Sequence, residues 1–210
     1  MDEKYLRPTR FIDCDNEAVI KYAHAKTSVD KSDKQKAVDL YYAVRDEILY
    51  DPYHLELRPE TISASLTLAR GRGYCVEKSL LLAAVGRVHG IPSRLGFSIV
   101  RNHLATPKFI EQLRSDKFVF HGYNEFWLNE KWVKCTPAFN KSLCEKFGVE
   151  PLDFDGEHDS IFHAFEHGKK YMEYLHDYGQ FDDLPYDLFV SELKLHYPHM
   201  FTEENPKLFA

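Results

Sequence analysis

Hydrophobic and polar positions alternate with a helical period over the first third of the chain. A first helix is predicted up to about Lys26, with Asp13 or Asp15 as its N-cap. Ser32 and Gln35 then form a capping-box pattern, in which each side chain can bond the backbone of the other residue. The helix that opens there has apolar residues every three or four positions, at Ala37, Val38, Tyr41, Val44 and Ile48.

The most apolar helix of the chain begins at Cys75, after a short third helix predicted over residues 61–69. Its apolar residues occupy most of the helix circumference, which is typical of a helix packed in the middle of a domain. Gly90 provides the helix end and Pro92 follows just beyond it.

Beyond this helix the chain becomes rich in aromatic and β-branched residues. Strands are predicted at 93–100, 118–128 and 132–136, and the short polar link 129–131 predicts an antiparallel hairpin. The tail over about 159–198 is predicted to be mostly helical.

Length and composition allow one domain over residues 1–210. With 210 residues, 44% of them hydrophobic, the chain can bury a substantial core. The net charge is −6, with 27 Lys and Arg against 33 Asp and Glu, and no long basic run occurs. Nucleic-acid binding is therefore not expected, since it calls for a clustered positive charge.

The N-terminal residues 1–8 are charged where a secretory signal would be apolar, and no apolar run approaches the roughly 20 residues of a membrane span. We expect a cytoplasmic protein with no membrane partner, and its oligomeric state is open. The four cysteines lack the spacing of a disulfide framework or of a structural zinc site; they are Cys14, Cys75, Cys135 and Cys144.

Cys75 lies where glycine-punctuated backbone, from Gly71 to Gly73, meets the first turn of the apolar helix. Unpaired N–H groups and the helix dipole favour a thiolate there, so the pKa of Cys75 is expected to lie below the free value of about 8.5. A thiolate is a nucleophile for acyl transfer. The simpler alternative is a small buried apolar residue.

His121 is the best-placed proton acceptor for Cys75 among eleven histidines. It starts a strand segment in which His121, Tyr123 and Glu125 share one face. A histidine at the mouth of that strand can meet the amino end of a central helix packed on the sheet, which would give a nucleophile and its acid–base partner. The alternative is an ordinary strand histidine.

Five motifs in this order resemble the transglutaminase-like superfamily. They are Gly73-Tyr74-Cys75 before the apolar helix, His89-Gly90-Ile91-Pro92-Ser93-Arg94 after it, His121 on a strand, Lys131-Trp132-Val133, and Thr136-Pro137. The match spans about 37–137, and later segments resemble bacterial transglutaminase-like proteins of unassigned substrate.

The resemblance implies an α+β fold with a papain-like core, in which a central helix packs on an antiparallel sheet, with additional N- and C-terminal helices. The core would cover about 37–140, followed by a helical C-terminal extension over about 141–210. It also implies a catalytic Cys75 and His121. Thr136 stands where the family has an aspartate; it can orient an imidazole but adds no charge. Asn140 and Asp155 are alternative orienting residues.

The function expected from this resemblance is acyl transfer from a peptide or amide substrate, which can be a protein, through a thioester. Water as acceptor gives a protease, amidase or deamidase and is favoured by its concentration; an amine gives a transglutaminase. The alternative is a binding or scaffold domain that has lost an effective triad. The tetrahedral oxyanion would need the Cys75 N–H and a second donor, for which Tyr50 or Tyr53 is the nearest source.

No cofactor and no metal are expected. A second group of side chains has partial zinc-site character, because two of its histidines are one helical turn apart; the group is His158, His163, Glu166 and His167. The segment lacks the HExxH pattern, and an exposed polar helix face is the commoner explanation.

Overall fold

The structure is a computed structural model that describes residues 2–53, 55–103, 105–161 and 172–202. Its α-helices are α1 (Glu17–Lys26), α2 (Asp33–Glu47), α3 (Ala64–Arg70), α4 (Cys75–Val88), α5 (Pro107–Leu113), α6 (Lys141–Phe147) and α7 (Tyr186–His196). Two 3-10 helices are η1 (Glu3–Tyr5) and η2 (Pro198–Met200). The strands are β1 (Leu49–Tyr50), β2 (Arg72–Gly73), β3 (Ser93–Asn102), β4 (Lys117–Leu128), β5 (Lys131–Cys135) and β6 (Met172–Phe181).

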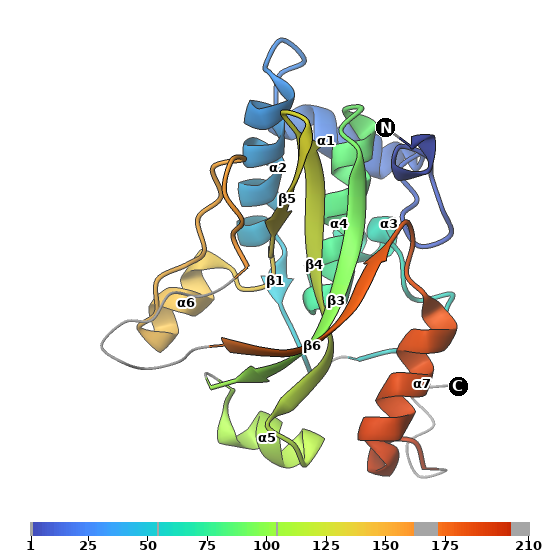
Figure 1. Cartoon of the computed structure of the whole chain (residues 1–210), viewed down its shortest axis with the longest axis vertical. Coiled ribbons are helices and arrows are strands. Elements are labelled where there is room, and N and C mark those ends of the chain that lie inside the picture. The colour runs from blue at the N-terminus through green and yellow to red at the C-terminus, as the bar shows by residue number, and fades with distance from the viewer. Residues whose placement is uncertain (1, 54, 104, 162–171, 203–210) are drawn as a thin grey trace.

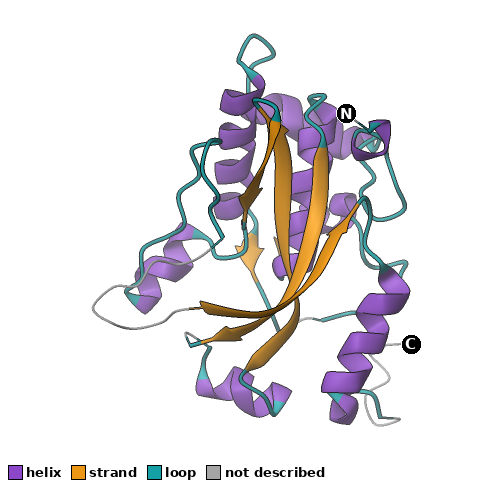
Figure 2. Cartoon of the chain, in the orientation of Figure 1, coloured by secondary structure: helices purple, strands orange, loops and turns teal. Residues whose placement is uncertain are grey.

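The four longer strands form an antiparallel sheet with the order β5-β4-β3-β6, and β1 pairs with β2 in parallel. Helix α4 lies behind this sheet, with α1, α2 and α3 around it (Figure 1). Figure 2 shows the helices gathered on that side and at the lower end of the sheet. The predicted α+β fold, with a central helix on an antiparallel sheet, is confirmed.

Local signals account for the helix starts. The capping box of α2 is present, since the Ser32 hydroxyl accepts from the Gln35 N–H and the Gln35 side chain accepts from the Ser32 N–H. Helix α1 is capped by Asn16 rather than by either predicted aspartate. Asp13 instead accepts from the N–H of Ser65 over 3.0 Å and so ties the N-terminal segment to α3.

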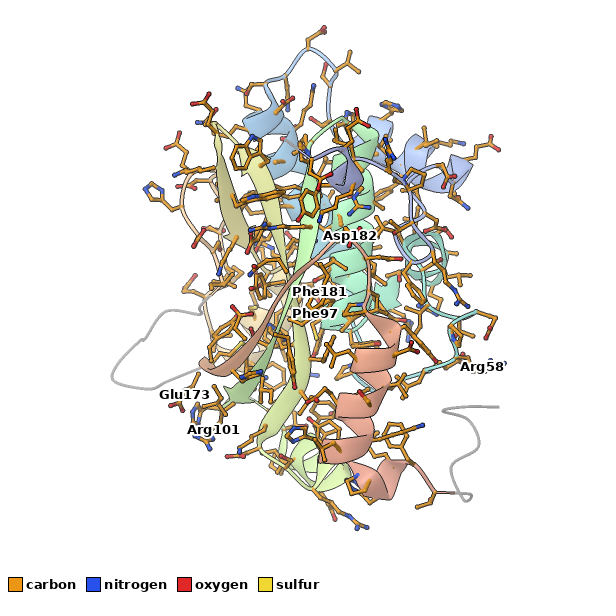
Figure 3. All side chains as sticks on the ribbon, turned by 45° about the vertical axis from the view of Figure 1, so that its right-hand side comes forward. Arg58, Phe97, Arg101, Glu173, Phe181 and Asp182 are labelled. Carbon is orange, nitrogen blue, oxygen red and sulfur yellow. The ribbon has the colours of Figure 1, made fainter. Side chains whose placement is uncertain are left out.

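The C-terminal extension contains a strand, so the expectation that it is helical is wrong for this part. β6 pairs with β3 along the sheet edge, and Phe181 packs beside Phe97 with 5.9 Å between ring centroids (Figure 3). Tyr174 and Tyr178 are four residues apart, a spacing that also fits a helix face. The segment forms a strand because the edge of β3 offers hydrogen-bond partners to its backbone N–H and C=O groups.

The core lies between α4 and the sheet, and every residue of α4 from Cys75 to Arg87 is buried. Among the described residues, no helix combines the length and the apolar character needed to cross a membrane.

Lys78 is fully buried on α4, where its Nζ donates to the carbonyls of Arg45 and Ile48 over 2.8 Å and 2.6 Å. These carbonyls end α2, so the amine caps that helix. Burial lowers the pKa of Lys78 to about 7, although the Asp46 carboxylate acts in the opposite direction.

This buried lysine predicts a pH-dependent stability. Between pH 7 and 10 the unfolded chain binds a proton on Lys78 that the folded chain lacks, so this residue makes the free energy of unfolding rise with pH. In Lys78→Met we expect that rise, a few kcal/mol, to be lost. Urea unfolding from pH 6.5 to 10 measures it, with exposed Lys21→Met as control. If the free energy of unfolding changed with pH in the same way in wild type and in Lys78→Met, the lowered pKa of Lys78 would be contradicted.

Candidate active site

Cys75 is the first residue of α4 and is 9% exposed. Burial raises the pKa of its thiol to about 11, against the N–H groups of Gly122 and Val76, which act to lower it. The nearby Glu77 carboxyl adds to the rise. The expectation of a thiol with a lowered pKa is therefore wrong, because burial favours the neutral thiol of Cys75.

Strand β4 comes close to the start of α4 at Gly122. A methyl group added to this glycine would lie 3.1 Å from Cα of Val76 and 3.2 Å from the carbonyl oxygen of Cys75. Two residues further on, Nδ2 of Asn124 donates to the carbonyl of Ser79 over 2.8 Å. These contacts fix the strand that carries the predicted histidine directly beside Cys75.

A β-bulge immediately precedes His121. The register of β3 and β4 shifts there, so that two β4 residues lie opposite one residue of β3. Phe120, inside the bulge, has a φ of 63°, a left-handed conformation that is unfavourable for a bulky residue. Aromatic packing offsets this cost, because the ring centroid of Phe120 lies 4.7 Å from that of Phe97 and 5.3 Å from that of Phe189. The bulge thus sets the direction of the His121 side chain.

Cys75 and His121 line the same narrow pocket, of about 70 Å³. The pocket lies between the start of α4, the first half of β4, α5 and α7. Its other walls are mostly apolar, which suits apolar groups of a substrate. The structure therefore brings together two of the three residues predicted for the site.

The third residue, Thr136, is buried directly after β5. Asn124 pairs with Cys135, which places Thr136 opposite Tyr123 and on the sheet face that carries His121. Diagonal neighbours on one face lie about 7–8 Å apart, within reach of a long side chain. Thr136 thus lies close to His121 on the same face of the sheet.

Tyr174 of β6 adds a second hydroxyl at this place, which the sequence did not predict. Its ring lies edge-on to that of His121, with 6.4 Å between centroids, and its hydroxyl donates to the carbonyl of Ile161 over 3.1 Å. Burial raises the pKa of Tyr174, while the adjacent Thr136 hydroxyl acts to lower it. The sequence pattern predicts a helix for this segment and gives no signal that joins Tyr174 to the site.

Tyr197, after α7, holds the start of β4. Its hydroxyl accepts from the N–H of Val119 over 2.9 Å and donates to the carbonyl of Lys117 over 2.7 Å. Leu193 and Met200 from the same segment line the pocket of Cys75. The C-terminal helix therefore forms one wall of the candidate active site.

The two alternatives to Thr136 are engaged elsewhere. Oδ1 of Asn140 accepts from the N–H of Tyr50 over 3.0 Å. Asp155 is exposed, and its carboxylate bonds the ring of His158 over 2.7 Å. The sheet register therefore favours Thr136 of the three.

The two tyrosines considered as oxyanion donors differ in position. Tyr50 lines the pocket with Cys75, whereas Tyr53 is 40% exposed and its hydroxyl pairs with that of Thr106 over 3.0 Å.

Three members of the zinc-like group, His163, Glu166 and His167, lie outside the described residues. Within the described ranges, no group of three or more His, Cys, Asp or Glu is arranged to hold a metal ion.

Comparisons with known proteins give the family and the fold of the chain. The family model described as the transglutaminase-like superfamily matches residues 20–137. A solved structure from Cytophaga hutchinsonii, of a protein called a "putative cysteine protease", is 18% identical, with a TM-score of 0.50. The similarity covers 63% of this chain and 40% of that one, and at this identity it shows the fold alone. No curated protein matches the chain.

Proposed function

Because the chain belongs to the transglutaminase-like superfamily, we propose that it is a cysteine-dependent acyl-transfer enzyme acting on peptide or amide substrates. The observation that carries the proposal is the shared pocket of Cys75 and His121 at the N-terminus of α4. Acyl transfer first requires a nucleophile and a proton acceptor close together, and a pocket that both residues line meets this requirement.

The reaction begins with attack of the Cys75 sulfur on the substrate carbonyl carbon. Since burial keeps the thiol neutral, its proton passes to a ring nitrogen of His121 as the C–S bond forms. The carbonyl oxygen becomes an oxyanion, which the Cys75 N–H at the helix start can stabilise. His121 then returns the proton to the departing amine, which leaves a thioester on Cys75 and a neutral imidazole.

The acceptor resolves the thioester. His121 takes a proton from water, the oxygen attacks the thioester carbonyl, and the sulfur leaves with that proton to regenerate the thiol. An amine in place of water gives transamidation. We favour hydrolysis, because bulk water outcompetes an amine by concentration unless the site excludes it.

Thr136 is proposed to orient His121. Thr136→Val keeps the side-chain shape but removes the hydroxyl, and we expect acylation of Cys75 by 4-nitrophenyl acetate to slow about tenfold at pH 7, which is less than the roughly 10²–10⁴ of a complete general-base effect. Thr136→Ser should retain most of the rate. The measurement is the nitrophenolate burst between pH 6 and 9. A role confined to packing would instead spare Thr136→Val and impair Thr136→Ser.

A second candidate function is a binding or scaffold domain. It is favoured by the neutral Thr136 in place of a carboxylate and by the buried Cys75.

We also propose a cytoplasmic location, because the four cysteines are all free and buried, which fits a reducing compartment.

One experiment separates the two functions. The protein is incubated with a library of peptides derived from a cell lysate, with and without an added primary amine, and the products are analysed by mass spectrometry. Cleaved, deamidated or amine-coupled peptides that are lost in Cys75→Ala support the enzyme. Identical product sets from wild type and Cys75→Ala would leave only the scaffold.

A further inference from the structure

A second cavity adjoins the pocket of Cys75, and we propose that it receives a phenylalanine side chain of the peptide substrate. This inference rests on the proposed function, because it deepens it by naming a substrate class. The cavity lies between α5, α6 and the segment after β1.

The two cavities meet at a shared aromatic wall. Tyr50, Pro52, Phe109 and Phe118 line both. Consecutive residues of a peptide are 3.8 Å apart at their Cα atoms, so a chain whose carbonyl lies at Cys75 carries its neighbouring side chains toward this wall. The second cavity is therefore within reach of a substrate already placed for attack.

The size and lining of the cavity define its occupant. It holds about 140 Å³, close to the roughly 150 Å³ of apolar protein cavities that bind benzene. Its surface is almost entirely apolar, with Phe139, Leu143 and Phe147 completing the wall on the α6 side. Burying a phenyl ring there is favourable, whereas a carboxylate would lose its hydration without a partner.

Ring geometry also suits an aromatic guest. Tyr50 and Phe139 meet edge to face with 4.8 Å between centroids, and Tyr53 and Phe109 do so with 5.5 Å. Rings already arranged edge to face leave faces and edges available for a further ring in the same kind of contact. The hydroxyls of Tyr53 and Thr106, 3.0 Å apart, provide a polar pair that can face the substrate backbone.

The test uses peptidyl chloromethyl ketones with the sequence acetyl-Ala-Ala-Ala, in which each position in turn is Phe or Asp. The rate of covalent labelling of Cys75 is measured by intact mass. At one position we expect Phe to label at least tenfold faster than Ala, and Asp to label more slowly than Ala.

Two substitutions at Leu143 identify the cavity. Leu143→Trp fills it and should reduce the preference for Phe to within about twofold. Leu143→Ala enlarges it and should shift the preference toward a naphthylalanine probe. Leu195→Trp, at a site on α7 that is 70% exposed, is the matched control and should keep the preference. Thermal unfolding of each variant confirms that it is folded.

A binding measurement separates the cavity from the chemistry. In Cys75→Ala, N-acetylphenylalaninamide should shift the NMR methyl signals of Leu143 and Val149, and N-acetylaspartamide should not. Binding without any labelling of Cys75 would overturn the proposed function and keep the cavity. Labelling at equal rates for Phe, Ala and Asp at every position, or no methyl shifts, would overturn the cavity proposal.

Discussion

Replacement of His121 by alanine is expected to slow acylation of Cys75 by 4-nitrophenyl acetate about 100-fold at pH 7. The physical reason is the neutral thiol: burial raises the pKa of Cys75 to about 11, so at pH 7 only on the order of one molecule in 10⁴ carries a thiolate without help. His121 lines the same pocket and can accept the proton during attack, an effect worth about 10²–10⁴ in rate. The measurement is the nitrophenolate burst under single-turnover conditions.

Two controls make the result specific to the Cys75 and His121 pair. Cys75→Ala should abolish the burst, which shows that the thiol is the acylated group. His24→Ala, at an exposed position on α1, should leave the rate within twofold of wild type. An unchanged rate in His121→Ala would mean that His121 is an ordinary strand histidine.

Replacement of Arg87 by methionine is expected to lower the free energy of unfolding by about 3–5 kcal/mol, because backbone carbonyls that lose a buried donor cost about 1–3 kcal/mol each. The guanidinium is 4% exposed and donates to three carbonyls from separate segments: Arg7 over 2.7 Å, Ser93 over 2.9 Å and Asp182 over 2.7 Å. Asp182, directly after β6, is labelled in Figure 3. Arg87 thus joins the N-terminal segment, β3 and the entry to α7.

Urea unfolding followed by tryptophan fluorescence measures this loss. With about 2–4 °C per kcal/mol for a chain of this size, the Tm should fall by roughly 10 °C. Arg7→Met removes an exposed pair with Glu3 and should cost under about 1 kcal/mol. If Arg87→Met and Arg7→Met lowered the free energy of unfolding by similar amounts, the hydrogen bonds of Arg87 to these three segments would not stabilise the fold as predicted.

The sequence predicted the elements whose causes are local. The capping box at Ser32, the apolar run after Cys75 and the hairpin after Leu128 each depend on neighbouring residues, and each is present. β6 was missed because tyrosines four residues apart fit a helix as well as a strand. Only the open edge of β3, distant along the chain, decides between them.

The candidate site was predictable to the same extent. Motif order predicts Cys75, His121 and Thr136 as site residues, because they lie within one contiguous family pattern, and Cys75 and His121 line one pocket in the structure. Tyr174 and Tyr197 could not be found this way, since they reach the site through pairings that span 50 residues or more in chain order. The raised pKa of Cys75 also depends on burial, which no local motif encodes.

The burial of Cys75 also determines how the protein meets oxidants. Hydrogen peroxide oxidises thiolates to sulfenic acid far more readily than neutral thiols, and it needs access to the sulfur. The Cys75 thiol has a pKa of about 11 and is 9% exposed, so it offers peroxide neither a thiolate nor easy access to the sulfur. The Cys75 thiol is thus held in a form that peroxide attacks slowly, and we expect the acyl transfer proposed for it to persist through oxidative stress that inactivates thiolate enzymes.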